Sequence, residues 1–106
     1  MKIYKLEDFD RGYFIGNFPK AIFKTNAFEV SLKKHLKTDK HELHYHKFVT
    51  EFILVVRGMM RVNGQVINEG HIFVLEPYMI NEIEYLDECE LVVVKSPSLP
   101  NDRVPI

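Results

Sequence analysis

The sequence has only one cysteine, Cys89, among its 106 residues. No intrachain disulfide can form, so the fold does not need an oxidising compartment. Cys89 lies between Glu88 and Glu90 and just before the apolar residues 91–94, in a run that is typical of a strand. Neighbouring carboxylates disfavour a reactive thiolate. We therefore expect Cys89 to be a structural thiol on a strand.

The chain also lacks an excess of charge of either sign. It has 14 lysines and arginines against 15 aspartates and glutamates, for a formal net charge of −1. This balance gives no electrostatic basis for binding nucleic acid or a membrane surface. No apolar run approaches the roughly 20 residues of a membrane helix, and residues 1–10 lack the apolar core of a signal peptide. We expect a cytoplasmic protein with no nucleic-acid or membrane partner.

Long amphipathic helices, solenoid repeats and low-complexity segments are absent as well. Short strand-like runs alternate with turn signals instead. Residues 27–34 alternate apolar and polar side chains, as a half-buried strand does. Asn63-Gly64, between two strand-like runs, is the strongest short hairpin signal. The sequence predicts a single all-β domain over residues 1–106, a sandwich or barrel, with an irregular proline-rich tail over residues 96–106.

Histidines are concentrated in residues 41–58, where three of the five in the chain fall within six positions. Residues i and i+2 of a strand point to the same face, so His44 and His46 present two imidazoles side by side. Glu51 follows after a short turn and can add a carboxylate from a neighbouring strand. Two imidazoles and a carboxylate suit Zn²⁺, or non-haem Fe²⁺ with open positions. The alternative is a polar strand whose histidines are exposed.

The spacing in this segment resembles the first signature of the cupin superfamily. That signature is a histidine, any residue, a second histidine, three or four residues, a glutamate, six residues and a glycine. His44, His46, Glu51 and Gly58 match every interval. The glycine that usually precedes the first histidine by six residues is replaced by Thr38.

A second cupin signature is matched less closely by residues 70–86. Gly70 and Pro77 stand where the family has its opening glycine and its turn proline, but Tyr78 replaces the glycine that usually follows. Most importantly, Asn81 stands where the third histidine of the family falls. The first signature is therefore quite specific, and the second is degraded.

The resemblance implies a small RmlC-like cupin, a jelly-roll β-barrel or double-stranded β-helix with signature hairpins at residues 41–58 and 70–86. It implies a divalent transition metal in the barrel mouth, commonly Fe, Mn, Zn, Ni or Cu. Known activities include dioxygenases, isomerases, epimerases and decarboxylases, and some members only bind ligands. Small cupins typically form homodimers, in which residues 13–18 could add strands across a two-fold axis.

Strand alternation over residues 81–85 places Asn81 and Tyr85 inside such a barrel and sends Glu82 and Glu84 to solvent. Asn81 can supply its amide oxygen as a weak fourth ligand, or hydrogen-bond a metal-bound water or substrate. Tyr85, like Tyr78, is a candidate for the pocket wall. The candidate metal ligands are His44, His46, Glu51 and Asn81, and the candidate catalytic residues are Glu51, Asn81 and Tyr85.

Two functions remain open from the sequence. The first is a metal-dependent isomerase, lyase or dioxygenase acting on a small carbohydrate-like or hydroxy-acid molecule. The second is a non-catalytic small-ligand-binding or sensing protein whose metal site is degraded at Asn81. His35 and His41 are interpreted as surface histidines. Arg57 and Arg61 either reach an anionic substrate or are exposed strand-end charges.

Overall fold

Short strands dominate the computed structural model, which describes all of residues 1–106. Two single-turn 3-10 helices come first, η1 (Leu6–Asp8) and η2 (Asp10–Gly12). The strands are β1 (Tyr13–Gly16), β2 (Phe23–Lys24), β3 (Glu29–His35), β4 (His44–Tyr45), β5 (Thr50–Arg57), β6 (Met59–Val62), β7 (Gln65–Asn68), β8 (Ile72–Leu75), β9 (Ile83–Tyr85), β10 (Cys89–Ser96) and β11 (Val104–Pro105). The all-β prediction is confirmed. No helix is both long enough and apolar enough to cross a membrane.

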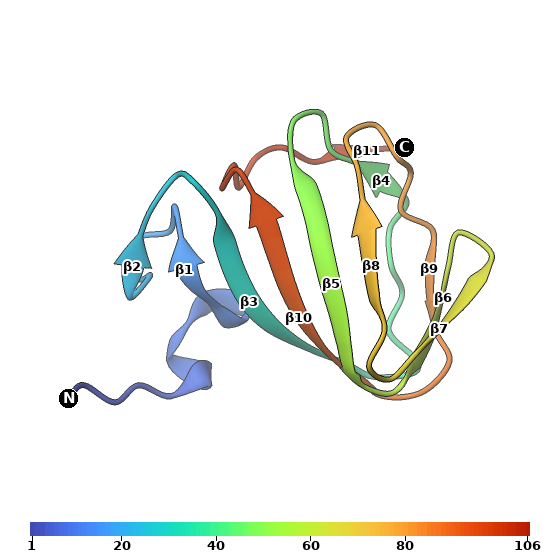
Figure 1. Cartoon of the computed structure of the whole chain (residues 1–106), viewed down its shortest axis with the longest axis horizontal. Helices are drawn as coiled ribbons and strands as arrows, with labels where there is room; N and C mark the ends of the chain where they lie inside the picture. The colour runs from blue at the N-terminus through green and yellow to red at the C-terminus, as the bar shows by residue number, and fades with distance from the viewer.

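The strands form three sheets arranged as an open sandwich (Figure 1). A six-stranded sheet has the order β2-β1-β3-β10-β5-β8 and makes the face nearest the viewer. A three-stranded sheet, β7-β6-β9, and a two-stranded sheet, β11-β4, cover its other side. No continuous ladder joins the three sheets, so they do not close into a barrel. One isolated bridge, between His44 and Asn81, links β4 to the segment before β9.

Neither signature segment forms the hairpin predicted for it. Within residues 41–58, β4 pairs with β11, whereas β5 pairs with β10 and β8. Within residues 70–86, β8 pairs with β5, and β9 pairs with β6. The hairpin prediction was wrong because each segment crosses from one sheet to another. As a result, each segment contributes strands to both sides of the interior space between the sheets.

The hairpin predicted from Asn63-Gly64 does form, between β6 and β7. Val62 pairs with Gln65, and the two residues between them have φ angles of 48° and 82°. Two consecutive positive φ angles are the geometry of the tight turn that matches strand twist, and asparagine followed by glycine adopts it readily. The local signal was sufficient because this turn depends on no distant contact.

The apolar core lies between the six-stranded and three-stranded sheets. Its buried members are Ile53, Val55, Met60, Val62, Leu75, Tyr85, Cys89, Leu91 and Val93. Cys89 is 2% exposed, and its thiol lies 3.4 Å from the backbone carbonyls of Met59 and Asp87. Burial raises the pKa of this thiol. The interpretation of Cys89 as a structural thiol is confirmed.

Strand β3 buries its polar face. Glu29 and Ser31 are 3% and 0% exposed and face the interior, whereas Val30 and Leu32 are half-buried on the other face. An alternating strand normally turns its apolar side chains inward. The reversal arises because the interior beside β3 is a polar cavity and not the apolar core.

The tail over residues 96–106 is more ordered than predicted. It contains β11, in which Val104 pairs with Tyr45 and Pro105 with His44. Ser98 is fully buried, and its hydroxyl donates to Glu29 Oε1 at 3.1 Å. The prediction of an irregular tail was therefore wrong in part, and the tail packs directly against the strand that carries the histidines.

Candidate metal centre

Strands β4 and β5 bring His44, His46 and Glu51 to one point inside the sandwich. His44 begins β4, His46 follows two residues later on the same face, and Glu51 is the first inward-facing residue of β5. The three side chains are buried, at 5%, 6% and 5% exposure. One nitrogen or oxygen atom of each lies within 4.8 Å of the others. The juxtaposition predicted from the spacing is present.

Backbone carbonyls fix the orientation of both imidazoles. His44 Nδ1 donates to the carbonyl oxygen of Glu42 at 2.9 Å, and His46 Nδ1 donates to the carbonyl oxygen of Asp102. A histidine whose Nδ1 carries the proton presents the lone pair of its Nε2, which is how metal-binding histidines are usually oriented. The backbone carbonyls therefore hold both rings by Nδ1, so that Nε2 of His44 faces Asn81 and Nε2 of His46 faces Glu51.

Glu51 is held as a carboxylate beside His46. Burial alone would raise the pKa of Glu51, but the His46 ring and the charge of Lys95 outweigh it and lower the pKa. Burial would likewise lower the pKa of His46, and the contact with Glu51 raises it. His46 Nε2 and Glu51 Oε1 are 2.6 Å apart. An ionised carboxylate is the form that can ligate a cation.

Asn81 completes the group. Its backbone N–H donates to the carbonyl oxygen of His44 at 2.9 Å, which places the side chain beside the histidines. Asn81 Nδ2 lies 3.3 Å from both His44 Nε2 and Glu51 Oε1, and the buried Oδ1 has no hydrogen-bond partner. An unpartnered buried oxygen is costly, and a half-turn of the amide would aim it at the same atoms. The donor set therefore fits a cation at this point.

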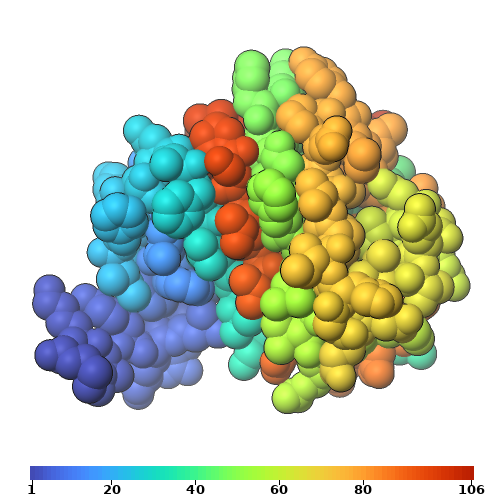
Figure 2. Space-filling view, viewed as in Figure 1, coloured from blue at the N-terminus to red at the C-terminus, as the bar shows by residue number.

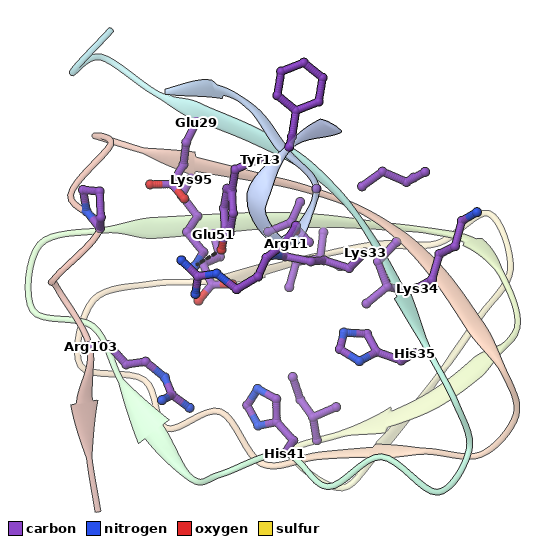
Figure 3. Close-up of a pocket in the computed structure, with 18 of the residues that line it drawn as sticks. Arg11, Tyr13, Glu29, Lys33, Lys34, His35, His41, Glu51, Lys95 and Arg103 are labelled. Carbon is purple, nitrogen blue, oxygen red and sulfur yellow. Dashed lines mark hydrogen bonds between the residues drawn. The ribbon is translucent and has the colours of Figure 1, made fainter. Parts of the chain in front are cut away.

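A cavity of about 1040 Å³ adjoins this group between the sheets (Figure 3). Ile53, Ile83 and Tyr85 line part of it. Tyr85 is 4% exposed, burial raises the pKa of its phenol, and its ring stacks on His35 with centroids 4.4 Å apart. Tyr85 therefore occupies the wall that the alternation predicts. Tyr78 does not, because it is 66% exposed and stacks on Tyr45 outside the cavity.

Two histidines interpreted as surface residues line the cavity. His41 lies with its ring centroid 4.9 Å from that of His44, and burial, aided by the charges of His44 and Arg103, lowers its pKa to about 4. His35 points inward from the end of β3. Strand alternation with His44 and His46 would turn His41 to the surface, but residues 41–43 precede β4 and are not extended strand.

Arg57 and Arg61 lie outside the cavity. Arg57 is 4.0 Å from Glu90 and Arg61 is 2.8 Å from Glu84, both at exposed positions. Of the two readings left open for these arginines, the structure supports exposed strand-end charges.

The cavity wall contains six lysines and arginines, none of which was predicted, and among them are Arg11, Lys33, Lys95 and Arg103. For one of them, Lys95, strand alternation in the sequence indicated the inward position. Along β10, Leu91 and Val93 face inward, and the same alternation continues to Lys95, which pairs in register with Glu51. Lys33 lies on the same face of β3 as Glu29 and Ser31, a polar face that an alternating strand normally turns to solvent. Arg11 and Arg103 reach the cavity through tertiary contacts of η2 and the tail, which leave no local pattern.

No protein-family model matches the sequence, and no curated protein matches it. Solved structures do match. An uncharacterised conserved protein with a double-stranded β-helix domain from Klebsiella pneumoniae shares 16% identity over 92% of this chain and 85% of that chain, with a TM-score of 0.67. A cupin-2 domain containing protein from Shewanella frigidimarina shares 19% identity over 72% of this chain and 76% of that chain, with a TM-score of 0.58.

Oxalate decarboxylase from Bacillus subtilis shares 17% identity over 77% of this chain, with a TM-score of 0.67, but only 24% of that longer chain is covered. At these identities the similarity establishes the fold and not the activity. The chain has the cupin, or double-stranded β-helix, fold.

Proposed function

We propose that this cupin-fold chain binds a divalent transition metal through His44, His46 and Glu51 and uses it in chemistry on a small molecule. One observation carries the proposal: three buried ligand atoms lie within 4.8 Å of one another at a cavity of about 1040 Å³. Two imidazoles and a carboxylate suit Fe²⁺, Mn²⁺, Zn²⁺ or Ni²⁺. A bound metal would polarise a substrate oxygen or activate O₂ or water.

The chain's own residues would position the substrate. Asn81 would either add Oδ1 as a weak fourth ligand or hydrogen-bond the substrate through its amide. Glu51 would serve as a ligand or as a general base. Tyr85 and Ile83 supply an apolar part of the cavity wall. Isomerase, lyase and dioxygenase chemistry on a hydroxy-acid or carbohydrate-like molecule all suit such a site.

A non-catalytic role is the second candidate, and Asn81 is the observation that favours it. The amide stands where cupins have a third histidine, and an amide oxygen is a weaker ligand for these metals than imidazole. In that case the chain would hold a metal or small ligand for sensing. A cytoplasmic location remains a prediction from the sequence.

Elemental analysis of protein purified without a histidine tag tests the metal. We expect close to one ion per chain in the wild type and almost none in His46→Ala. His71→Ala is the matched control, because His71 is exposed in a turn and lies outside the cavity. Negligible metal in the wild type, or equal metal in His46→Ala, would contradict the proposal.

Catalysis and simple binding are separated by following a bound ligand over time. Metal-loaded protein is incubated with small carboxylates and sugars, and each mixture is monitored by proton NMR. New resonances that grow with time in the wild type and are absent with His46→Ala indicate an enzyme. A ligand that binds and stays unchanged over hours indicates the non-catalytic role.

A further inference from the structure

Three cations surround one tyrosine in the cavity wall. The Nζ of Lys33 lies 3.6 Å from the centroid of the Tyr13 ring, the guanidinium carbon of Arg11 5.2 Å and the Nζ of Lys95 5.7 Å. Lys95 also donates to the Tyr13 hydroxyl at 3.3 Å. Figure 3 shows these four side chains together along the same side of the cavity as Glu51. They come from η2, β1, β3 and β10, so the fold assembles them.

Lysines and arginines outnumber the carboxylates in this part of the cavity, although, against the effect of burial, Glu51 and Glu29 raise the pKa of Lys95. Neither Lys33 nor Lys95 forms an ion pair, and Arg11 reaches only Asp10, at 3.7 Å with both side chains largely exposed. Glu29 is buried nearby, where burial raises its pKa while the charge of Lys95, the Ser98 hydroxyl at 3.1 Å and the charge of Lys33 oppose that rise. The complete cavity lining has six lysines and arginines against four aspartates and glutamates, in a chain whose formal net charge is −1.

The backbone of η2 is shaped to present Arg11. Arg11 has a φ of 52°, which is rare for a residue with a side chain, and Gly12 follows with a φ of 77°. A Cβ on Gly12 would lie 2.2 Å from the carbonyl oxygen of Leu32, so only glycine lets η2 approach β3 this closely. Lys33 Nζ donates to the Arg11 carbonyl at 2.7 Å and holds the turn against β3.

The arrangement brings like charges together around Lys33, whose ammonium has no carboxylate within ion-pair distance. Burial, and then the charges of Lys95 and Arg11, lower the pKa of Lys33 to about 7, with Glu29 and Asp10 only partly opposing them. Repulsion of this kind is relieved when an anion lies among the cations. Strained backbone beside a cavity is also typical of a ligand site.

We propose that Arg11, Lys33 and Lys95, gathered around Tyr13, bind the carboxylate or phosphate group of the small molecule that the cavity accepts. The ligand is thus anionic. A ligand that also carries an oxygen donor could contact this cation cluster and the metal at the same time. The contact with the metal rests on the proposed metal function. Arg11, whose side chain is 67% exposed, is the most solvent-exposed of the three cations.

The test measures anion binding in protein stripped of metal by a chelator, so that it does not depend on the metal site. Calorimetric titrations use inorganic phosphate, succinate and uncharged glucose as probes. We expect phosphate or succinate to bind at least ten times more tightly than glucose, and the tighter of the two identifies the anionic group. Equal binding of glucose, or no binding of either anion, would overturn the proposal.

Variants assign the binding to this cluster. Lys33→Met should weaken anion binding at least tenfold, while Lys37→Met, on the exposed loop after β3, should leave it unchanged. His46→Ala should also keep anion binding, which separates this inference from the metal proposal. In the wild type the bound anion should raise the pKa of Lys33, measured by NMR of carbon-labelled lysine. Unchanged affinity in Lys33→Met, or a Lys33 pKa that the anion does not move, would contradict it.

Discussion

Asn81 is the residue on which the strength of the metal centre depends. Its amide lies 3.3 Å from His44 Nε2 and from Glu51 Oε1, so a longer side chain with a nitrogen donor at this place could reach a shared cation. Imidazole is a stronger ligand than an amide for Fe²⁺, Zn²⁺ and Ni²⁺. Asn81→His should therefore raise metal affinity by about tenfold or more.

Competition with a chromophoric chelator measures this affinity in both proteins. Asn81→Ala is the companion variant, and it should bind metal no more tightly than the wild type because it offers no ligand atom. An affinity that is the same for asparagine and histidine at position 81 would show that this side chain lies away from the metal.

The lowered pKa of Lys33 predicts that the stability of the fold depends on pH. This pKa is about 7 in the folded protein, lowered chiefly by burial, against 10.5 for a free lysine. Between these values the unfolded chain holds a proton that the folded chain has lost, so stability rises with pH from about 7 towards 10. Below pH 7 both states are protonated and this contribution no longer changes.

Urea unfolding of the wild type and of Lys33→Met at pH 6 and pH 9 measures the effect. Groups that do not interact with Lys33 titrate equally in both proteins, so the difference between the two reports on Lys33 and its neighbours Glu29 and His35. We expect the wild type to gain on the order of 1 kcal/mol relative to the variant over this range, less than a fully buried lysine would show. A constant difference at the two pH values would contradict the lowered pKa.

At the candidate site, local spacing predicted the members that share one short segment. His44, His46 and Glu51 fall in eight consecutive positions, and strand geometry fixes their relative placement. His41 was misplaced because the chain is not extended before β4, and Arg11 was missed because η2 reaches the cavity only by packing on β3. Periodicity carries no information about such contacts.

Among the elements, the tail over residues 96–106 supports the candidate metal centre through one side chain, that of Asp102. The carboxylate of Asp102 accepts the backbone N–H groups of Lys47, Phe48 and Val49 at 3.0, 2.8 and 3.0 Å. These bonds fix the turn between β4 and β5, and the Asp102 carbonyl accepts from His46 Nδ1. The tail therefore orients one ligand and joins it to the strand that carries Glu51.

Asp102→Ala should lower stability by about 1–3 kcal/mol, because three N–H groups lose their acceptor. Metal affinity should fall about 10- to 100-fold, as when an outer partner of a ligand is displaced. Thermal unfolding and chelator competition report the two effects. Asn101→Ala, one residue earlier and exposed, is the control and should change neither. Wild-type metal affinity in Asp102→Ala would show that the tail does not position His46.

The sequence predicted where strands form more accurately than which strands pair with one another. The Asn63-Gly64 turn was confirmed because hairpins of this kind are local. The segments at 41–58 and 70–86 were expected to be hairpins, yet their strands separate into different sheets. Which strand pairs with which is decided by long-range packing of the core, and a list of strand-like runs does not contain that choice.

For the whole molecule, the unexpected feature is the outer face of the six-stranded sheet, which is the face seen in Figure 2. On β10, β5 and β8 it carries two cross-strand rows of apolar side chains that face away from the core. One row is Val94, Phe52 and Val74, and the other is Val92, Leu54 and Ile72. Phe52, Val74 and Ile72 are 41%, 44% and 66% exposed. Contiguous apolar surface of this kind usually marks an interface.

We propose that a second copy of the chain covers these two rows. The rows contain no charged side chain, so the patch can face its own two-fold copy without repulsion. The structure pairs β1 with β2 and β3 of the same chain, which uses part of the N-terminal segment first considered for strand exchange between subunits. The outer sheet face is therefore the better place for the expected homodimer.

Sedimentation equilibrium tests the dimer at micromolar chain concentration. The wild type should have twice the mass of the chain, and Phe52→Lys should shift it to the mass of one chain, because a buried unpaired charge opposes association. Val66→Lys is the matched control: Val66 is 48% exposed on β7, in another sheet, and should leave the dimer intact. Circular dichroism confirms that each variant is folded. A monomeric wild type, or a dimer that Phe52→Lys does not weaken, would exclude this face as the interface.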